Sequence, residues 1–435
     1  MKKVTAVLIG AGHRGVDAYA PYALEYPQEL RFVAVAEPDG GRRESFRQRH
    51  GIEEGRCFSS WEELLREERL ADAALICTQD RMHFEPALKA LEKGYHVLLE
   101  KPMAAAPGHC LEMGEYAARF GRIFSVCHVL RFTSFFSTVK KLLDGGRIGR
   151  LISIQHNENL AYWHQAHSYV RGNWRNSADS SPMILAKSCH DLDILLWLAG
   201  ADCARVSSFG SLTHFKSGNA PEGAPERCLD ACPAGEGCIY HAAKLYLTGN
   251  TDWPTSVISP DMSMEARTKA LREGPYGRCV YRCDNNVVDH QVVNIEFANE
   301  VTAAFTMCAF TGSNTRTIKL MGTGGEIRGA MEKNEIEITD FSSQRKEIVR
   351  LDEAGGSTGH NGGDRGLIRD FVRLVQKDGA DEGLTSAGIS VQSHLMAFAA
   401  EKSRLERRVI EMEDYIKELK SLQRGGSGPA AADHP

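Results

Sequence analysis

The sequence predicts two domains, a doubly wound parallel α/β domain at residues 1–130 and an α+β domain with a mainly antiparallel sheet at residues 131–410. The first observation is an apolar strand pattern at residues 4–9 that breaks into a glycine-rich run. The second is that strand and helix patterns alternate up to about residue 130, as in a parallel sheet with helices on both faces. The third is that the later strands follow one another with only turn residues between them, which favours antiparallel pairing.

The glycine-rich run is Gly10-Ala11-Gly12-His13-Arg14-Gly15, placed between a predicted strand and a predicted helix. Gly10 allows a tight turn, Gly12 lets the backbone approach a phosphate, and Gly15 lets the helix pack closely on the strand. Because a helix N-terminus also offers free N–H donors, the run predicts a Rossmann domain that holds a dinucleotide pyrophosphate, with His13 and Arg14 in the binding loop.

The residue after the second strand predicts which dinucleotide binds. This strand, at residues 31–36, ends in Glu37, about 20 residues beyond the glycines. A carboxylate there accepts hydrogen bonds from the ribose hydroxyls and repels a 2′-phosphate, which favours NAD. Arg42 and Arg43 follow closely and keep NADP open as the alternative.

Two more strand ends should line the cofactor cleft, because an open parallel sheet places its ligand at the carboxyl ends of its strands. A buried strand at residues 73–78 ends in Thr78, and the next strand leads into Glu100-Lys101-Pro102. Helices are expected at residues 42–50, 61–68 and 84–92, and a strand at residues 123–128 completes this half.

The second half is expected to begin with a helix at residues 139–145 and a strand at residues 151–154. Further strands are predicted at residues 294–297, 302–307, 317–321, 335–338 and 346–350, and helices at residues 364–375 and 386–407. Residues 411–435 should hold a helix end and then a disordered tail, because the last residues have no means of forming a core.

Three motifs in this order resemble those of the Gfo/Idh/MocA oxidoreductases, named for glucose-fructose oxidoreductase and inositol dehydrogenase. They are the glycine run, Glu100-Lys101-Pro102 and Ser188-Cys189-His190-Asp191-Leu192-Asp193, and the resemblance covers about residues 1–410. It implies that the second domain has a large open-faced sheet, carries the substrate and forms a homo-oligomer, a dimer or a tetramer. It also implies hydride transfer between a nicotinamide and a secondary hydroxyl or keto carbon of a sugar, cyclitol or sugar derivative.

The resemblance implies that Lys101 lies beside the nicotinamide and the reacting hydroxyl, and that His190 accepts the proton. Elementary chemistry agrees, because removing hydride from a secondary alcohol needs a base, and a nearby ammonium stabilises the developing alkoxide. A dinucleotide sensor without activity is a weaker hypothesis, since it would need neither residue. The resemblance also places around the cofactor Thr78, Gln79, His83, Glu100, His128 and Arg131, with Trp174 and Arg175 reaching it from the second domain.

One position departs from the pattern of the resemblance. Many members carry Asp four residues before the histidine, one helical turn away, whereas this chain has Ala186 there and Lys187 next to it. Lys187 could enter the substrate site as a second cation, replace the missing acid as a base, or cover the helix surface.

Residues 162–175 are unusually rich in aromatic, histidine and arginine side chains. Aromatic rings stack on the apolar faces of sugars, and polar side chains bind the hydroxyls. Such a segment is unsuited to a core, so we expect a substrate-site loop, with Trp174 in contact with substrate and His164 and His167 as candidates for an additional acid or base.

A second glycine-rich loop, residues 355–364, surrounds His360 and resembles the Gly-Gly-His-Gly-Gly loop of NAD-dependent N-acetylgalactosaminidases. This resemblance supports an alternative function, redox-neutral glycoside cleavage by oxidation, elimination, hydration and reduction. His360 is then a candidate for substrate binding, and a flexible connector is the other interpretation.

Five cysteines, Cys228, Cys232, Cys238, Cys279 and Cys283, lie in a predicted insertion at about residues 212–286. Their spacing matches none of the usual metal-binding pairs, so free thiols or a labile disulfide are favoured over zinc or an iron–sulfur cluster, and no metal is assigned.

Composition excludes several classes of partner. The formal net charge is −5, with acidic and basic residues interleaved, so no nucleic-acid surface is expected. No apolar run approaches the ~20 residues that span a membrane, and the first strand begins too early for a signal peptide, so a cytoplasmic location is expected.

Overall fold

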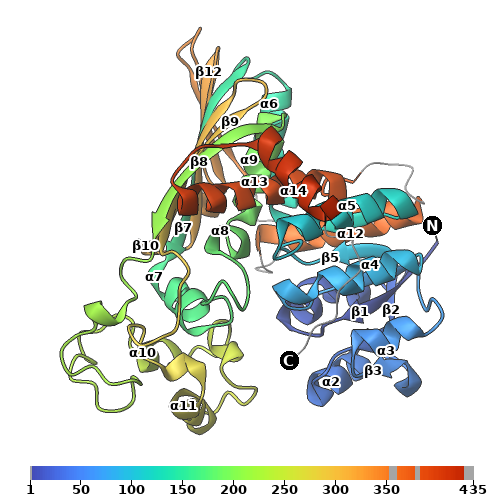
Figure 1. Ribbon diagram of the computed structural model, residues 1–435, viewed down its shortest axis with the longest axis vertical. Coiled ribbons are helices and arrows are strands. Elements are labelled where there is room, and N and C mark those ends of the chain that lie inside the picture. The colour runs from blue at the N-terminus through green and yellow to red at the C-terminus, as the bar shows by residue number, and fades with distance from the viewer. Residues whose placement is uncertain (1, 352–359, 378–382, 426–435) are drawn as a thin grey trace.

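The N-terminal part of the chain forms a six-stranded parallel sheet in the computed structural model, which describes residues 2–351, 360–377 and 383–425 (Figure 1). The strand order is β3-β2-β1-β4-β5-β6. The chain therefore adds β2 and β3 on one side of β1, and then adds β4, β5 and β6 on the other side. At such a reversal the loops after the strands diverge and leave room for a ligand. The strands are β1 (Val4–Ile9), β2 (Leu30–Ala36), β3 (Cys57–Phe58), β4 (Ala73–Ile76), β5 (His96–Leu99) and β6 (Phe124–Val126).

Helices connect these strands, as the alternating pattern predicts. They include α1 (Pro21–Glu25), α2 (Gly40–His50), α3 (Trp61–Arg66), α4 (Phe84–Glu92) and α5 (Pro107–Phe120). The ends of α5 follow from its sequence, because Pro107 suits the first helical turn and Gly121, with φ of +58°, accepts the left-handed conformation after the last turn. The predicted Rossmann domain is confirmed.

The second sheet has nine described strands in the order β14-β13-β12-β11-β7-β10-β9-β8-β15. All neighbouring pairs are antiparallel except β7 with β10. The strands are β7 (Leu151–Ala161), β8 (Cys203–Ser211), β9 (His290–Phe297), β10 (Thr302–Thr311), β11 (Thr315–Gly322), β12 (Gly325–Ala330), β13 (Glu335–Asp340), β14 (Lys346–Arg350) and β15 (Ile410–Glu411).

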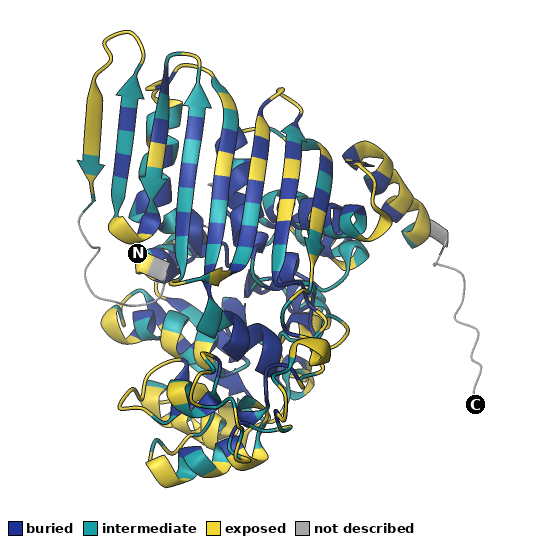
Figure 2. Cartoon of the chain, turned by 90° about the vertical axis from the view of Figure 1, so that its left-hand side faces the viewer, coloured by how far each residue is buried: buried dark blue, intermediate teal, exposed yellow. Residues whose placement is uncertain are grey.

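One face of this sheet is open. Buried and more exposed residues alternate along its strands (Figure 2), as along β9, where Val293, Ile295 and Phe297 are buried. Helices α6 (Ser134–Asp144), α9 (Cys189–Ala199) and α13 (Ala387–Glu406) contact strands of the sheet. The predicted α+β domain with an open-faced, mainly antiparallel sheet is confirmed.

Three features of this sheet were not predicted. Strand β7 continues to Ala161, well beyond the predicted end at residue 154, because Asn157 and Asn159 bond to threonines of β11 across the sheet. Strand β12 contains Gly329, where a Cβ would lie 2.6 Å from the ring of Phe135, so the packing of α6 requires glycine there. Strand β8 lacks the apolar alternation by which strands are usually recognised.

The C-terminal part of the chain returns to the first sheet. Helix α12 (Gly363–Gln376) packs Leu367, Ile368 and Phe371 into the same apolar cluster as β1 and β2. A Cβ on Gly363 would lie 2.4 Å from the carbonyl O of Val129, so this close approach requires glycine. The last helix, α14 (Met412–Gly425), contacts α5 and α13. The predicted disordered tail lies outside the described residues.

Between β8 and β9 the chain leaves the sheet and forms a separate lobe at the lower left of Figure 1. Residues 212–289, all described, contain helices α10 (Ala242–Tyr246) and α11 (Met264–Glu273) and short helical turns. We call this segment the insertion lobe. Among the described residues, no helix is both long enough and apolar enough to span a membrane.

Candidate active site

The turn after β1 has the shape that a dinucleotide requires. Gly10 has φ of +90°, and a Cβ there would lie 2.7 Å from the carbonyl O of Cys77. A Cβ on Gly15 would lie 2.7 Å from the carbonyl O of Gly10, whereas a Cβ on Gly12 would meet nothing within 4 Å. Gly10 and Gly15 are therefore needed by the fold, and Gly12 faces open space in which a pyrophosphate fits.

Glu37 lies beside this turn and is 4% exposed. Its Oε2 accepts a hydrogen bond from the N–H of Ala11 at 2.8 Å, and its Oε1 accepts one from the N–H of Asp39 at 3.0 Å. Arg42 forms an ion pair with it at 3.0 Å from an exposed position. These contacts hold a carboxylate at the end of β2, as recognition of the ribose of NAD requires.

Arg14 and Glu100 bind each other. Arg14 Nε donates to Glu100 Oε1 at 2.5 Å, and Arg14 Nη2 donates to Asp364 Oδ1 at 2.6 Å. Glu100 also accepts from the Tyr19 hydroxyl at 2.7 Å and from the N–H of Lys101 at 2.5 Å. Burial raises the pKa of Glu100, but the charges of Arg14 and Lys101 outweigh it and the pKa is lowered. Both residues thus fix the glycine turn, the Lys101 loop and α12 to one another.

The loop after β5 is held by His83, which is 1% exposed. One ring nitrogen, Nδ1, lies 2.7 Å from the carbonyl O of Pro102, and Nε2 lies 3.1 Å from the carbonyl O of Thr78. His83 therefore connects the two strand ends that were predicted to line the cofactor cleft.

A second histidine, His394 of α13, also holds this loop and was not predicted. Its Nε2 accepts from the N–H of Met103 at 2.8 Å, so Nδ1 carries the proton and donates to the carbonyl O of Ser390 at 2.7 Å. Burial lowers the pKa of His394 to about 3, which keeps the ring neutral. No motif marks this residue, because it lies nearly 300 residues from the loop that it supports.

Lys101 reaches from the first domain to the segment that leads into α9, the helix that bears His190. Lys101 Nζ donates to the carbonyl O of Ala186 at 2.8 Å. Ala186 ends the short helix α8 (Met183–Ala186), and α9 begins three residues later with His190 as its second residue. The His190 ring is 4% exposed and lies edge-on to the ring of His128, with centroids 5.9 Å apart. Lys101 therefore contacts the backbone four residues before His190.

His128 and Arg131 are held by the same helix. Arg131 makes a two-pronged ion pair with Asp193, from Nε to Oδ2 at 2.6 Å and from Nη2 to Oδ1 at 2.8 Å. His128 is fully buried, 3.8 Å from Asp193. Burial lowers the pKa of His128 to about 4, and the charges of Arg131 and Lys101 act in the same direction. Arg131 thus ties the segment that follows β6 to α9.

The expectation that residues 186, 187 and 190 share one helix is wrong. The helix breaks at Lys187, whose φ and ψ are −109° and −50°, and α9 starts afresh at Cys189. The Lys187 ammonium pairs with Glu158 of β7 at 3.0 Å. Burial lowers the pKa of Lys187, and the charge of Glu158 opposes this shift. Lys187, whose side chain is 16% exposed, is therefore a partner of the sheet and does not cover a helix surface.

Glu158 belongs to a charged network under α9 that sequence inspection missed. Arg316 of β11 pairs with Glu158 and also donates from Nε to Asp191 Oδ1 at 2.7 Å. His156 Nε2 lies 2.8 Å from the same oxygen. Burial opposes ionisation of Asp191, but Arg316 and His156 lower its pKa well below the usual range. The network fixes α9, and with it His190, to β7 and β11.

The prediction of a loop over residues 162–175 is wrong for most of its length. Residues Tyr162–His164 form α7, and Gln165–Arg171 form a buried π-helical turn. The insertion lobe supplies the partners that make this burial favourable. His167 Nδ1 lies 2.8 Å from the Tyr246 hydroxyl, and the His167 ring stacks on Tyr276 with centroids 4.9 Å apart. Burial lowers the pKa of His167 to about 3, so it serves as a neutral structural histidine.

His164 differs, because it is only partly buried and lies near Lys187. Its Nδ1 donates to Asn314 Oδ1 at 2.9 Å, which leaves Nε2 as the acceptor of the neutral ring. Burial and the charge of Lys187 hold its pKa well below the ordinary value. Of the two candidate histidines in this segment, His164 is the one placed near the charged network.

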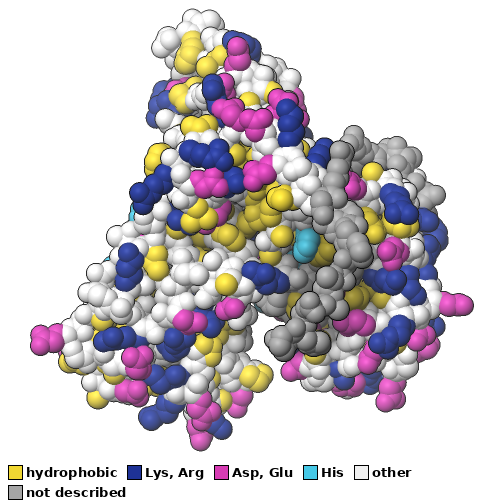
Figure 3. Space-filling model, in the orientation of Figure 1, with side chains coloured by type: hydrophobic (Ala, Val, Ile, Leu, Met, Phe, Trp, Pro, Cys, Tyr) yellow, Lys and Arg dark blue, Asp and Glu magenta, His cyan; other side chains and the backbone are white. Residues whose placement is uncertain are grey.

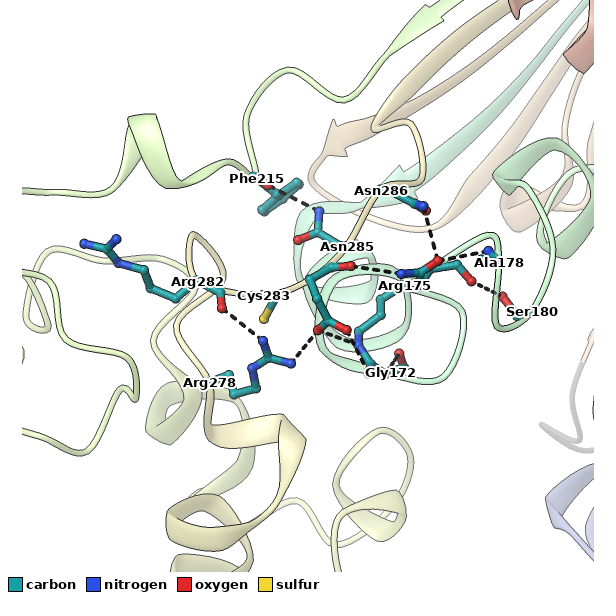
Figure 4. A network of polar contacts seen from close by, with 12 residues as sticks. Gly172, Arg175, Ala178, Ser180, Phe215, Arg278, Arg282, Cys283, Asn285 and Asn286 are labelled. Atoms are coloured by element: carbon teal, nitrogen blue, oxygen red, sulfur yellow. Dashed lines mark hydrogen bonds and ion pairs between the residues drawn. The ribbon is translucent and has the colours of Figure 1, made fainter. Parts of the chain in front are cut away.

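Trp174 and Arg175 diverge after this helical segment. Trp174 Nε1 donates to Asp80 Oδ1 of the first domain at 3.3 Å. Arg175 instead binds Asp284 of the insertion lobe, from Nε at 2.9 Å and from Nη2 at 3.2 Å, and Arg278 donates to the same carboxylate at 2.5 Å (Figure 4). Arg175 thus connects the segment after the π-helical turn to the insertion lobe. This contact differs from the cofactor contact that was predicted for it.

The predictions for His360 and for the cysteine-rich insertion concern two other parts of the chain. The backbone of His360 begins a short helical turn before α12, but its side chain lies outside the described residues.

All twelve cysteines are free thiols, and Cys228, Cys232, Cys238 and Cys279 line a small cavity in the insertion lobe. Within the described ranges, no group of three or more His, Cys, Asp or Glu side chains is arranged to hold a metal ion.

Comparison with known proteins adds family membership to this geometry. Residues 4–128 match the model described as "Oxidoreductase family, NAD-binding Rossmann fold", and residues 140–412 match "Oxidoreductase family, C-terminal alpha/beta domain". A similar relative is 2,7-anhydro-N-acetylneuraminate hydratase of Mediterraneibacter gnavus, 27% identical over 48% of this chain and 53% of the relative. Another is inositol 2-dehydrogenase of Streptomyces avermitilis, 29% identical over 50% of this chain and 58% of the relative.

The chain therefore spans little more than half the length of these two curated relatives. A solved structure, an oxidoreductase from Agrobacterium radiobacter in complex with NAD+, L-tartaric acid and magnesium, shares the fold with a TM-score of 0.69. The two chains are 14% identical, and the match covers 95% of this chain and 99% of the other. Together with the glycine turn, Lys101 and His190, these matches show that the chain belongs to the Gfo/Idh/MocA oxidoreductase family and carries its NAD-binding Rossmann domain.

Proposed function

We propose that this protein transfers hydride between NAD and a secondary hydroxyl or keto carbon of a sugar, cyclitol or sugar derivative. The observation that carries the proposal is the contact of Lys101 Nζ with the carbonyl O of Ala186, because it brings an ammonium from the cofactor domain to the start of the helix that bears His190. The names of the dehydrogenase relatives support a cyclitol or sugar as substrate.

The residues present fit the cofactor and divide the chemistry between them. Gly12 and Glu37 would hold NAD, which would supply the hydride acceptor when bound. Lys101 has three N–H donors, and only one is used by Ala186, so the others are available to the reacting oxygen. His190 takes the hydroxyl proton as the carbonyl forms, and the ammonium of Lys101 stabilises the developing negative charge. Asp191 and Asp193, which follow His190 in α9, hold the helix in place.

The test is incubation of the NAD-loaded protein with a panel of sugars, cyclitols and aryl glycosides, following NADH formation and aglycone release together. We expect stoichiometric NADH and ketone formation with at least one sugar or cyclitol. Absence of NADH, of bound-NADH signal and of aglycone release across the panel would favour the dinucleotide sensor instead.

A second candidate is redox-neutral cleavage, in which the hydride returns to the substrate. The hydratase relative supports it, since that enzyme is named for addition of water. It predicts aglycone release without net NADH and cofactor that stays bound through purification. Free exchange of NAD during turnover would argue for net oxidation or reduction.

The open face of the second sheet supports a homo-oligomer. Phe209 of β8 is 64% exposed and is paired with Val292 of β9, which is 38% exposed. Neighbouring apolar side chains on an open sheet face favour burial against a second copy. Light scattering should give the mass of a dimer or tetramer, and Phe209→Glu should lower it; a monomeric wild type contradicts the proposal.

A cytoplasmic location, favoured by the free cysteines, stays a prediction.

A further inference from the structure

Trp253 of the insertion lobe lies against the histidines of the helical segment below β7. Its ring centroid lies 4.8 Å from that of His164 and 5.5 Å from that of His167, both edge-on, and 5.6 Å from that of Trp163. Trp253 keeps 37% of its surface exposed. Two indoles therefore meet at the edge of the insertion lobe, next to a neutral histidine.

The loop that presents Trp253 is built rigidly. Arg267 of α11 is 3% exposed, and its Nη1 donates to the carbonyl O of Tyr246 at 2.8 Å and to that of Thr248 at 3.0 Å. The same nitrogen donates to the carbonyl O of Asn250 at 3.3 Å, so this buried guanidinium holds three alternate carbonyls of the chain that leads to Trp253. The ion pair of Arg175 with Asp284 connects the other end of the lobe to the segment that carries Trp174 (Figure 4).

This aromatic group adjoins the proposed reaction site but is separate from it. His164 connects them, because its Nδ1 bonds Asn314 Oδ1 at 2.9 Å, two residues before Arg316, whose Nε donates to Asp191 next to His190 at 2.7 Å. On the face shown in Figure 3, a hollow separates the lobe at the lower left from the Rossmann domain.

We propose that Trp253 and Trp163 form a subsite for a second ring, joined to the ring that is oxidised. Flat apolar faces next to a hydrogen-bond acceptor suit a sugar or aromatic ring, which has apolar faces and polar edges. The substrate class is then a glycoside in which Trp253 selects the second ring. This inference rests on the proposed function, because it names the part of the substrate that lies beyond the reacting carbon.

Methyl and phenyl glycosides of the same sugars are matched one-ring and two-ring probes. Their binding to the NAD-loaded full chain is measured by calorimetry, which needs no turnover. We expect the wild type to bind at least one phenyl glycoside about 10-fold more tightly than its methyl counterpart, the increment expected of one added ring stack. Trp253→Ala should remove most of this preference and leave methyl glycoside binding unchanged, and Trp253→Phe should retain part of it.

Phe341, which is 46% exposed in the turn after β13, supplies the control, since Phe341→Ala should change neither affinity. A wild type without phenyl preference for any sugar, or a preference that survives in Trp253→Ala, overturns the subsite. A phenyl preference without NADH formation or aglycone release would instead contradict the hydride transfer and leave the subsite standing.

Discussion

Gly10 and Gly12, two residues apart, have different physical requirements. Gly10 needs its positive φ and its contact with Cys77, whereas the space around Gly12 is open. The motif alone predicts a tight turn at Gly10 and a close approach of phosphate at Gly12. It cannot show that Gly10 packs against the backbone while Gly12 faces open space. Glu37 is a similar case, because the sequence places it near the ribose and only the structure shows its bond to Ala11.

This difference separates cofactor binding from folding. Gly12→Ala should leave the thermal unfolding temperature nearly unchanged but weaken NAD binding by about 10-fold or more, because the new methyl group occupies the place of the phosphates. Gly10→Ala should lower stability by more than about 1 kcal/mol, since alanine is strained at this φ and its Cβ meets Cys77. The measurements are calorimetric unfolding and NAD titration. Equal effects of the two substitutions on stability would contradict this assignment.

At the scale of elements, the Rossmann strands and helices could be predicted because their patterns are local. The helical segment at residues 162–171 could not, because its polar and aromatic residues are buried by partners far along the chain. His167 is satisfied by Tyr246, and Arg171 donates to the carbonyl O of Tyr240 at 2.7 Å. The break between α8 and α9 was also hidden, since Lys187 takes its partner from β7.

The pair of Lys187 with Glu158 makes a stability prediction. Lys187→Met should lower the free energy of unfolding by about 2 kcal/mol, because it leaves buried Glu158 with Arg316 as its remaining partner. Lys346→Met is the matched control, because Lys346 pairs with Glu337 on the surface, and it should cost less than about 0.5 kcal/mol. Chemical denaturation measures both. Indistinguishable costs would show that the buried pair contributes no more than an exposed one.

At the scale of the whole molecule, the site is assembled from segments that are distant in the sequence. Helix α12 covers the first sheet, His394 of α13 holds the loop after Lys101, and Arg131, just after the last strand of the first sheet, binds Asp193 of α9. Family resemblance predicts the catalytic pair and the two domains. It does not predict these supports, because each depends on contacts that leave no local pattern in the sequence.

Buried histidines make the folded state sensitive to acid. The pKa of His128 is lowered to about 4 by burial, and those of His167 and His394 to about 3. An unfolded histidine takes up a proton near pH 6.5, so between about pH 6.5 and pH 4 the unfolded state binds more protons and stability falls as the pH falls.

The contribution of His128 can be isolated by substitution. His128→Asn should reduce the slope of unfolding free energy against pH, measured between pH 6 and pH 5, by close to one proton. Denaturant titrations of both proteins at several pH values give the two slopes. Identical slopes would mean that His128 is protonated in the folded protein.

The central claim is that Lys101 acts on the reacting oxygen, so that its loss affects the reaction far more than it affects cofactor binding. The direct test is the rate of NADH formation when NAD-loaded protein is mixed with the active sugar or cyclitol, compared between the wild type, Lys101→Met and the surface control Lys89→Met. We expect Lys101→Met to lower this rate by about 10²- to 10⁴-fold, with NAD affinity changed by less than about 3-fold and with Lys89→Met unaffected. A Lys101→Met protein that forms NADH at close to the wild-type rate would contradict the account.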